Sequence, residues 1–139
     1  MKIYTSYFAK EKVLNELGIL PISISLFPPK WFTGQRLHYL APKKFMLDDS
    51  MTEEEYEKHY IDILEKVDIK TLGITLRDIA HGKDVAFLCF EKPGDFCHRH
   101  ILAKWLSKKT GVDIQEYVFE QKPEKKKEIV TPPTLFDNE

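Results

Sequence analysis

The chain has 139 residues, 42% of them hydrophobic and 31% charged, and this composition predicts one soluble globular domain with a substantial core. Its 21 basic and 22 acidic residues nearly cancel, which excludes a global positive field and leaves only local contacts for nucleic-acid binding. No apolar run approaches the ~20 residues of a membrane span, and no signal peptide is recognisable. We therefore expect a cytoplasmic protein without a membrane partner, in which Cys89 and Cys97 are reduced thiols rather than a disulfide.

The first part of the chain changes from a strand pattern to a helix pattern and back. Residues 2–7 are rich in β-formers and predict a strand, and residues 9–17 predict a short helix that ends at Gly18. In residues 20–26 apolar side chains alternate with serines, which is typical of a second strand. Because a helix-sized connection joins the two strands, we expect them to be parallel.

A long segment, residues 27–44, follows the second strand. Its Pro28 and Pro29 cannot continue a helix or a central strand, and connections of this length are usually functional or disordered. Lys30 and Arg36 occur there among aromatic residues, a mixture found on surfaces that bind single-stranded nucleic acid. Packing of the aromatic rings onto the core is the alternative explanation. We predict that Lys30 and Arg36 contact the ligand.

The rest of the chain completes an α/β pattern. Thr52 and Glu55 have the spacing of a capping box, which predicts the start of a helix. An apolar, aromatic-rich run then predicts a buried strand at 85–90. We further expect a helix at 71–81, a helix at 96–109 and a last strand at 114–119. The sequence thus predicts a single-domain α/β fold over residues 1–120, with a mostly parallel central sheet of about four strands flanked by helices. Residues 121–139 are expected to be a flexible charged linker and tail.

Reactive side chains are concentrated where the strand at 85–90 gives way to the next helix. The carboxyl ends of strands are where open α/β sheets bind ligands. A helix N-terminus at that edge presents unpaired N–H groups and a positive dipole end, which suits anions and thiolates. The candidates at this junction are Glu91, Lys92, Asp95, Cys97, His98 and Arg99.

Three of these candidates have chemistry suited to catalysis, and each also has a structural alternative. Cys97, in the first turn of the helix, would be a nucleophilic thiol or a small buried side chain. His98 lies on the buried arc of the helix and would assist it, or would only bond to the backbone, whereas His100 points away. Glu91 would be a general base or the partner of a cation.

The other three candidates would hold the ligand or the loop. Arg99 has the planar fork that suits phosphate or carboxylate, with a surface salt bridge as its alternative. Lys92 adds a second cation, and Asp95 is predicted to be the N-cap of the helix.

Metal ligands are also present in this segment. Cys89, Cys97, His98 and His100 fall within twelve positions. Adjacent helical residues diverge by ~100°, whereas structural zinc needs convergent ligands, so we predict no metal site. No motif for another cofactor is present.

The residues Cys89-Phe-Glu-Lys-Pro-Gly-Asp-Phe-Cys-His-Arg99 resemble the signature of the family of domain of unknown function 488. The resemblance extends over roughly residues 1–118. It implies a compact α/β domain with its site around Cys97, His98 and Arg99, without supplying an established reaction. Many members carry Asp-x-Arg at the end of the second strand, where this chain has Ser23-Ile24-Ser25. The role of that arginine is therefore missing here or passes to Lys30 or Arg36.

The end of the chain has a second resemblance. Pro133-Thr-Leu-Phe-Asp137 is similar to the short ends by which bacterial proteins dock into the replication sliding clamp, although the usual glutamine is absent. Leu135 and Phe136 would be the apolar anchors, and an ordinary disordered end is the alternative.

Two functional hypotheses follow from these patterns. In the first, the protein is a small intracellular enzyme, with hydrolysis as its candidate reaction, or a ligand-binding domain that acts on a nucleotide or nucleic acid through the Cys-His-Arg site. In the second, it is a non-catalytic accessory module of DNA replication or repair that docks to a sliding clamp through its Leu-Phe tail.

Overall fold

Five parallel strands form the central sheet, in the order β3-β2-β4-β1-β5. The computed structural model describes residues 1–91 and 96–119, and every element below belongs to that part. The strands are β1 (Ile3–Tyr7), β2 (Ile19–Ser23), β3 (Gln35–Arg36), β4 (Asp84–Cys89) and β5 (Gln115–Glu116). The helices are α1 (Glu11–Glu16), α2 (Glu53–Leu64), α3 (Ile69–Ala80) and α4 (His98–Thr110). The predicted single-domain α/β fold with a parallel sheet is therefore confirmed.

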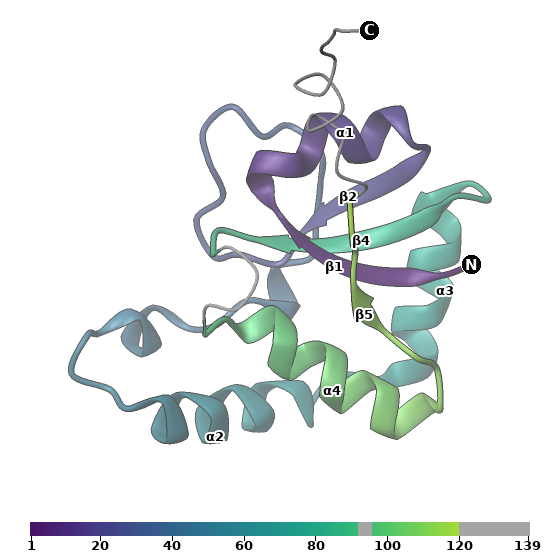
Figure 1. Ribbon diagram of the computed structural model, residues 1–139. Coiled ribbons are helices and arrows are strands. Elements are labelled where there is room, and N and C mark those ends of the chain that lie inside the picture. The colour runs from purple at the N-terminus through teal and green to yellow at the C-terminus, as the bar shows by residue number, and fades with distance from the viewer. Residues whose placement is uncertain (92–95, 120–139) are drawn as a thin grey trace, which may run out of the picture.

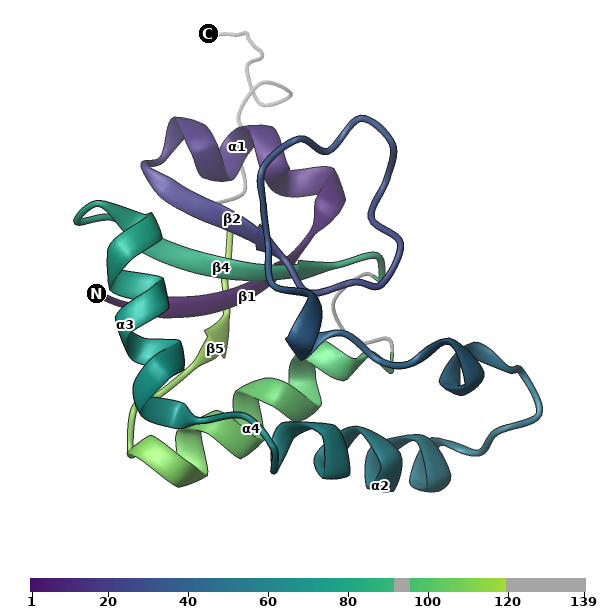
Figure 2. The ribbon, with the colours of Figure 1, turned by 180° about the vertical axis from the view of Figure 1, so that it is seen from behind.

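Helices cover the two faces of the sheet unequally (Figures 1 and 2). α1 lies on one face, where Leu14 packs in a cluster with Phe32 and with Leu88 of β4. α2, α3 and α4 lie on the opposite face, over a larger core that includes Ile22 and Phe87. Alternate residues of β4 thus point to opposite faces and both are covered, which explains why this strand is a continuous apolar run.

Two expected elements differ from the structure. The sheet has five strands rather than about four, because Gln35 and Arg36 pair with the end of β2. Both residues are exposed and this strand has only two residues, so it leaves no alternating pattern in the sequence. The first helix, expected over 9–17, is a 3-10 turn (Phe8–Lys10) followed by the short α1.

The edge at the carboxyl ends of the strands is where a site is expected. β4 pairs with β1 on one side and with β2 on the other. The chain leaves β1 toward α1 on one face, whereas it leaves β4 toward α4 on the other (Figure 1). In open α/β sheets, ligands bind at the carboxyl ends of the strands near such a point of divergence.

No helix in residues 1–91 or 96–119 has the length and apolar character to cross a bilayer.

The predicted capping box begins α2. Thr52 has an extended backbone and its hydroxyl accepts the N–H of Glu55 at 3.1 Å. The Glu55 carboxylate in turn accepts the N–H of Thr52 at 2.9 Å, and this bond lowers the pKa of Glu55. Two amides at the start of the helix are thereby satisfied.

We expect Thr52→Ala to lower the free energy of unfolding by about 1 kcal/mol, because the Glu55 amide loses its side-chain acceptor. Urea denaturation of the full chain measures the change. Thr52→Ser keeps the hydroxyl and is the control. An equal loss in both variants would show that the methyl group, and not the cap, stabilises the helix start.

Candidate functional site

Helix α4 begins two residues later than its pattern suggests. Cys97 is the N-cap, with φ −157° and ψ 145°, and His98 is the first helical residue. The prediction that Asp95 is the N-cap is therefore wrong, because the chain is still extended two residues after it. Asp95 and Lys92 themselves lie outside the described residues. The ~100° divergence expected for helical neighbours does not apply to an extended residue followed by a helical one.

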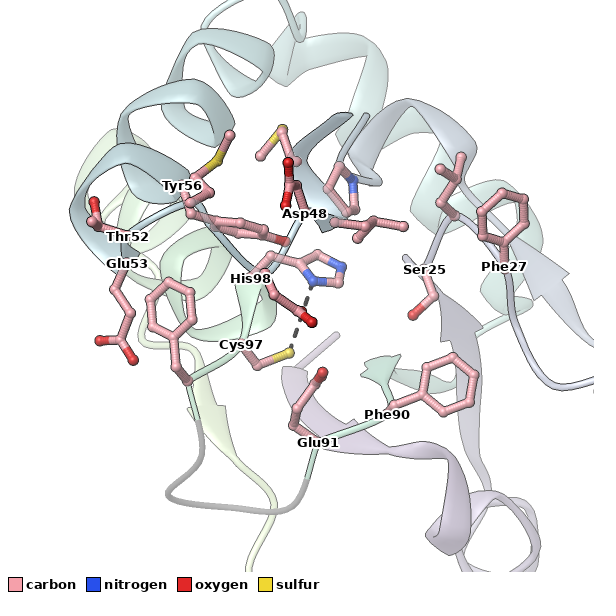
Figure 3. A pocket seen from close by; sticks show the side chains of 17 residues that line it. Ser25, Phe27, Asp48, Thr52, Glu53, Tyr56, Phe90, Glu91, Cys97 and His98 are labelled. Carbon is pink, nitrogen blue, oxygen red and sulfur yellow. Dashed lines mark hydrogen bonds between the residues drawn. The ribbon is translucent and has the colours of Figure 1, made fainter. Parts of the chain in front are cut away.

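The imidazole of His98 is fixed by the backbone of the β2 side of the sheet. Its Nε2 lies 2.7 Å from the carbonyl oxygen of Ile24 and, because a carbonyl only accepts, Nε2 carries the ring proton. The other nitrogen, Nδ1, is then unprotonated and lies 3.8 Å from Sγ of Cys97 (Figure 3). Burial lowers the pKa of His98 to about 4, against the opposing effect of the Ile24 hydrogen bond. The ring is therefore neutral at pH 7.

The two cysteines meet where β4 ends and α4 begins. Their Sγ atoms form a disulfide, with Cys89 fully buried and Cys97 4% exposed. The expectation of two separate thiols is therefore wrong in this structure. The extended backbone at Cys97 turns its side chain back toward β4, and the sequence pattern did not indicate this turn.

Arg99 is fully buried and connects the cysteines to β5. Its Nε and Nη2 donate to the two carboxylate oxygens of Glu116, each at 3.0 Å. Its Nη1 donates to the carbonyl oxygen of Glu91 at 2.6 Å and to Sγ of Cys89 at 2.9 Å. Sγ of Cys97 lies 3.6 Å from the same nitrogen. The guanidinium of Arg99 therefore holds the two sulfurs in place. It could contact a ligand directly only if it gave up its hydrogen bonds to Glu116, Glu91 and Cys89.

A pocket of about 390 Å³ opens beside this cluster (Figure 3). One wall comes from the ends of β2 and β4 and the start of α4, and the other from residues 46–56 ahead of and within α2. Its carboxylates are Asp48, Asp49, Glu53 and Glu91, and its aromatic rings are Phe27, Tyr56, Phe90 and Phe96. Cys97 and His98 lie at its base, and no lysine or arginine of residues 1–91 or 96–119 lines it.

Asp48 and Tyr56 in the pocket have pKa values shifted by their surroundings. A hydrogen bond from the N–H of Ser50 lowers the pKa of Asp48, which keeps that carboxylate ionised. Burial raises the pKa of Tyr56, and the negative charge of Glu91 raises it further. Tyr56 therefore keeps its proton and can donate a hydrogen bond to a ligand.

Only some of the predicted site residues lie together at the pocket. Glu91, Cys97 and His98 line the pocket. Lys30 and Arg36 do not: Lys30 is exposed, and Arg36, in β3, donates to the carbonyl oxygen of Phe32 at 3.0 Å.

His100 also differs from its prediction. It is half-buried rather than pointing away, and its Nε2 has no hydrogen-bond partner among the described residues. Burial lowers its pKa, and the charge of Arg99 lowers it further. His100 does not line the pocket.

Two residues of the site were missed by the sequence analysis. Glu116 is remote in sequence from Arg99, and its role depends on β5 pairing beside β1, where it lies opposite Thr5. Tyr60 of α2 lies edge-on to His98, with 5.3 Å between ring centroids, and its hydroxyl donates to the carbonyl oxygen of Leu40 at 2.6 Å. The contact between Tyr60 and His98 joins α2 to α4, and no local sequence pattern indicates it.

Comparison with known proteins places these features in a family. Residues 23–110 match the model of the family described as "DUF488-N3a: Active DUF488-N3 subclade". No curated protein and no solved structure matches the chain. The matched segment runs from the end of β2 to the end of α4 and contains every residue that lines the pocket. The chain therefore belongs to the DUF488 family.

Proposed function

We propose that the protein is a hydrolytic enzyme acting on the base-containing part of a nucleotide or nucleic acid. The observation that supports this proposal is the pocket at the sheet edge, which is lined by exposed aromatic rings and by Cys97 and His98. The description of the matched subclade as active agrees with an enzyme.

Aromatic side chains at the pocket favour a nucleobase as the ligand. Phe27, Phe90 and Phe96 line the pocket and are 61%, 52% and 38% exposed. Large apolar rings left in water beside a cavity favour a flat partner, and stacking of a nucleobase on such a ring contributes about 1–3 kcal/mol.

The negative charge of the pocket also limits which part of a nucleotide can enter it. The four carboxylates repel a phosphate from the pocket itself, which favours a base or a sugar inside it. Carboxylate oxygens accept hydrogen bonds from amino and hydroxyl groups, which bases and sugars have. A phosphate would stay outside the pocket, and Lys92, next to Glu91 in the chain, remains our predicted contact for it.

The groups proposed to react lie near the base of the pocket. Glu91 lines the pocket near its base and is the candidate to take a proton from the attacking water. When the disulfide is reduced, the thiol of Cys97 and the unprotonated Nδ1 of His98 form the reaction centre beside it. Arg99 acts as a positioning residue, because its donors are bound by Glu116, by the Glu91 carbonyl and by sulfur.

We expect Phe90→Ala to weaken binding of nucleosides and single-stranded oligonucleotides by about 1–3 kcal/mol, measured by calorimetry on the full chain. Phe45→Ala is the matched control, since Phe45 is 56% exposed but does not line the pocket. Equal losses in both variants, or no binding of any nucleoside by the wild type, would contradict the proposal.

Docking to a sliding clamp remains a prediction. Leu135 and Phe136, on which it rests, lie outside the described residues.

A further inference from the structure

Three potential metal ligands converge behind the pocket. Sγ of Cys89, Sγ of Cys97 and a ring nitrogen of His98 all lie within 4.8 Å of one another. We propose that, when the two sulfurs are reduced, Cys89, Cys97 and His98 bind a zinc ion whose fourth position faces the pocket. Two thiolates and an imidazole are ligands that zinc prefers, and three protein ligands with one open position are typical of catalytic zinc.

The histidine is already arranged as a ligand. Its Nε2–H is bound by the Ile24 carbonyl, so Nδ1 presents a lone pair on the side of Cys97. Metal-binding histidines nearly always have their second nitrogen held in this way, by a backbone carbonyl or a carboxylate. His98 does not need to reorient or lose a proton before it binds.

The surroundings of the sulfurs also suit thiolates. Arg99 directs Nη1 at both sulfurs, at 2.9 Å for Cys89 and 3.6 Å for Cys97. A cation beside a thiol favours the thiolate, which is the form that binds metal. Because Glu116 neutralises Arg99, two thiolates and one Zn²⁺ leave the buried cluster without net charge.

Backbone spacing agrees with a bridging ion. The Cα atoms of Cys89 and Cys97 are 7.5 Å apart. Most disulfides span about 4.4–6.8 Å between Cα atoms, whereas a metal held at about 2.3 Å from each sulfur accommodates a wider separation.

The fourth coordination position of the zinc would give the Glu91 carboxylate a role in catalysis. Cys97 and His98 line the pocket together with Glu91, so a water bound to the ion would lie in the pocket. Zinc lowers the pKa of such a water to about 7, and Glu91 would take its proton. Two cysteines, one histidine and a glutamate that is not a ligand also make up the water-activating site of zinc enzymes that hydrolyse nucleobases. This catalytic use rests on the proposed function, whereas zinc binding does not.

The test measures zinc in the full chain without any nucleoside. The protein is reduced with a phosphine, which supplies the two electrons that open the disulfide, and is then dialysed against buffered zinc. We expect one zinc per chain, and thiolate-to-metal charge-transfer absorption when cobalt replaces zinc. Cys89→Ser, Cys97→Ser and His98→Gln should weaken zinc binding more than about 100-fold, the upper limit for loss of a supporting residue. His100→Gln and Glu91→Gln are the controls and should keep the zinc.

Several outcomes would overturn the site. These are a reduced wild type that binds no zinc, cobalt spectra without thiolate absorption, and a disulfide that the phosphine cannot open. The cobalt spectrum needs no variant, so it decides the matter even if a cysteine substitution prevents folding. If the reduced wild type binds no zinc but still binds nucleosides, with the loss expected for Phe90→Ala, the metal site fails while the nucleoside-binding part of the proposed function stands.

Discussion

Glu116→Ala is expected to lower the free energy of unfolding by about 3 kcal/mol, because it leaves the buried guanidinium of Arg99 without its carboxylate. This is the lower end of the range for a broken buried pair, since the Glu116 side chain keeps 22% exposure whereas Arg99 has none. The hydroxyl of Thr5, which donates to Glu116 at 2.6 Å, also loses its acceptor. Denaturant unfolding monitored by circular dichroism gives the value.

The matched control for Glu116→Ala removes both charges. The double variant Arg99→Met with Glu116→Leu should recover most of the lost stability, because no unpaired charge is then buried. A loss below about 1 kcal/mol in Glu116→Ala, the value of an exposed ion pair, would show that water reaches the guanidinium. A double variant as unstable as the single one would contradict the buried-charge explanation.

Tyr60→Ala is expected to cost about 3–5 kcal/mol, because it removes a fully buried ring between α2 and α4. The ring contacts His98 and its hydroxyl holds the Leu40 carbonyl, so the 3-10 turn His38–Leu40 ahead of the pocket wall should loosen as well. Urea denaturation measures the loss of stability. Amide hydrogen exchange in residues 38–47 measures the loosening.

Tyr60→Phe separates the two contributions. It keeps the ring and removes the hydroxyl, leaving the Leu40 carbonyl without its donor, and should cost about 1–3 kcal/mol. If Tyr60→Phe were as unstable as Tyr60→Ala, the hydrogen bond rather than the ring would be the main contribution of Tyr60.

Regular periodicity predicted most of the fold. The apolar run of β4 indicated a buried strand and the alternation in β2 indicated a second strand, and both are central in the sheet. The capping box of α2 was found from Thr52 and Glu55, because a cap depends on residues close in sequence. β3 was missed because its two residues pair only through the backbone.

The site was predictable only where neighbours in the chain determine it. Glu91, Cys97 and His98 were identified from their position after a strand, and they do line one pocket. The start of α4 was misplaced because the extended conformation of Cys97 depends on contacts made across the fold. Glu116 could not be found, since its contact with Arg99 requires the pairing of β5 with β1.

Three consecutive side chains tie the start of α4 to three different parts of the sheet. The sulfur of Cys97 reaches β4, the imidazole of His98 reaches the residue after β2, and the guanidinium of Arg99 reaches β5. A one-residue insertion between positions 97 and 98 would change the spacing between the sulfur and the other two groups, so the three contacts could not all be kept in their present geometry. Residues 97–99 thus join α4 to the sheet at three points, so every substitution among them must be paired with a folding measurement.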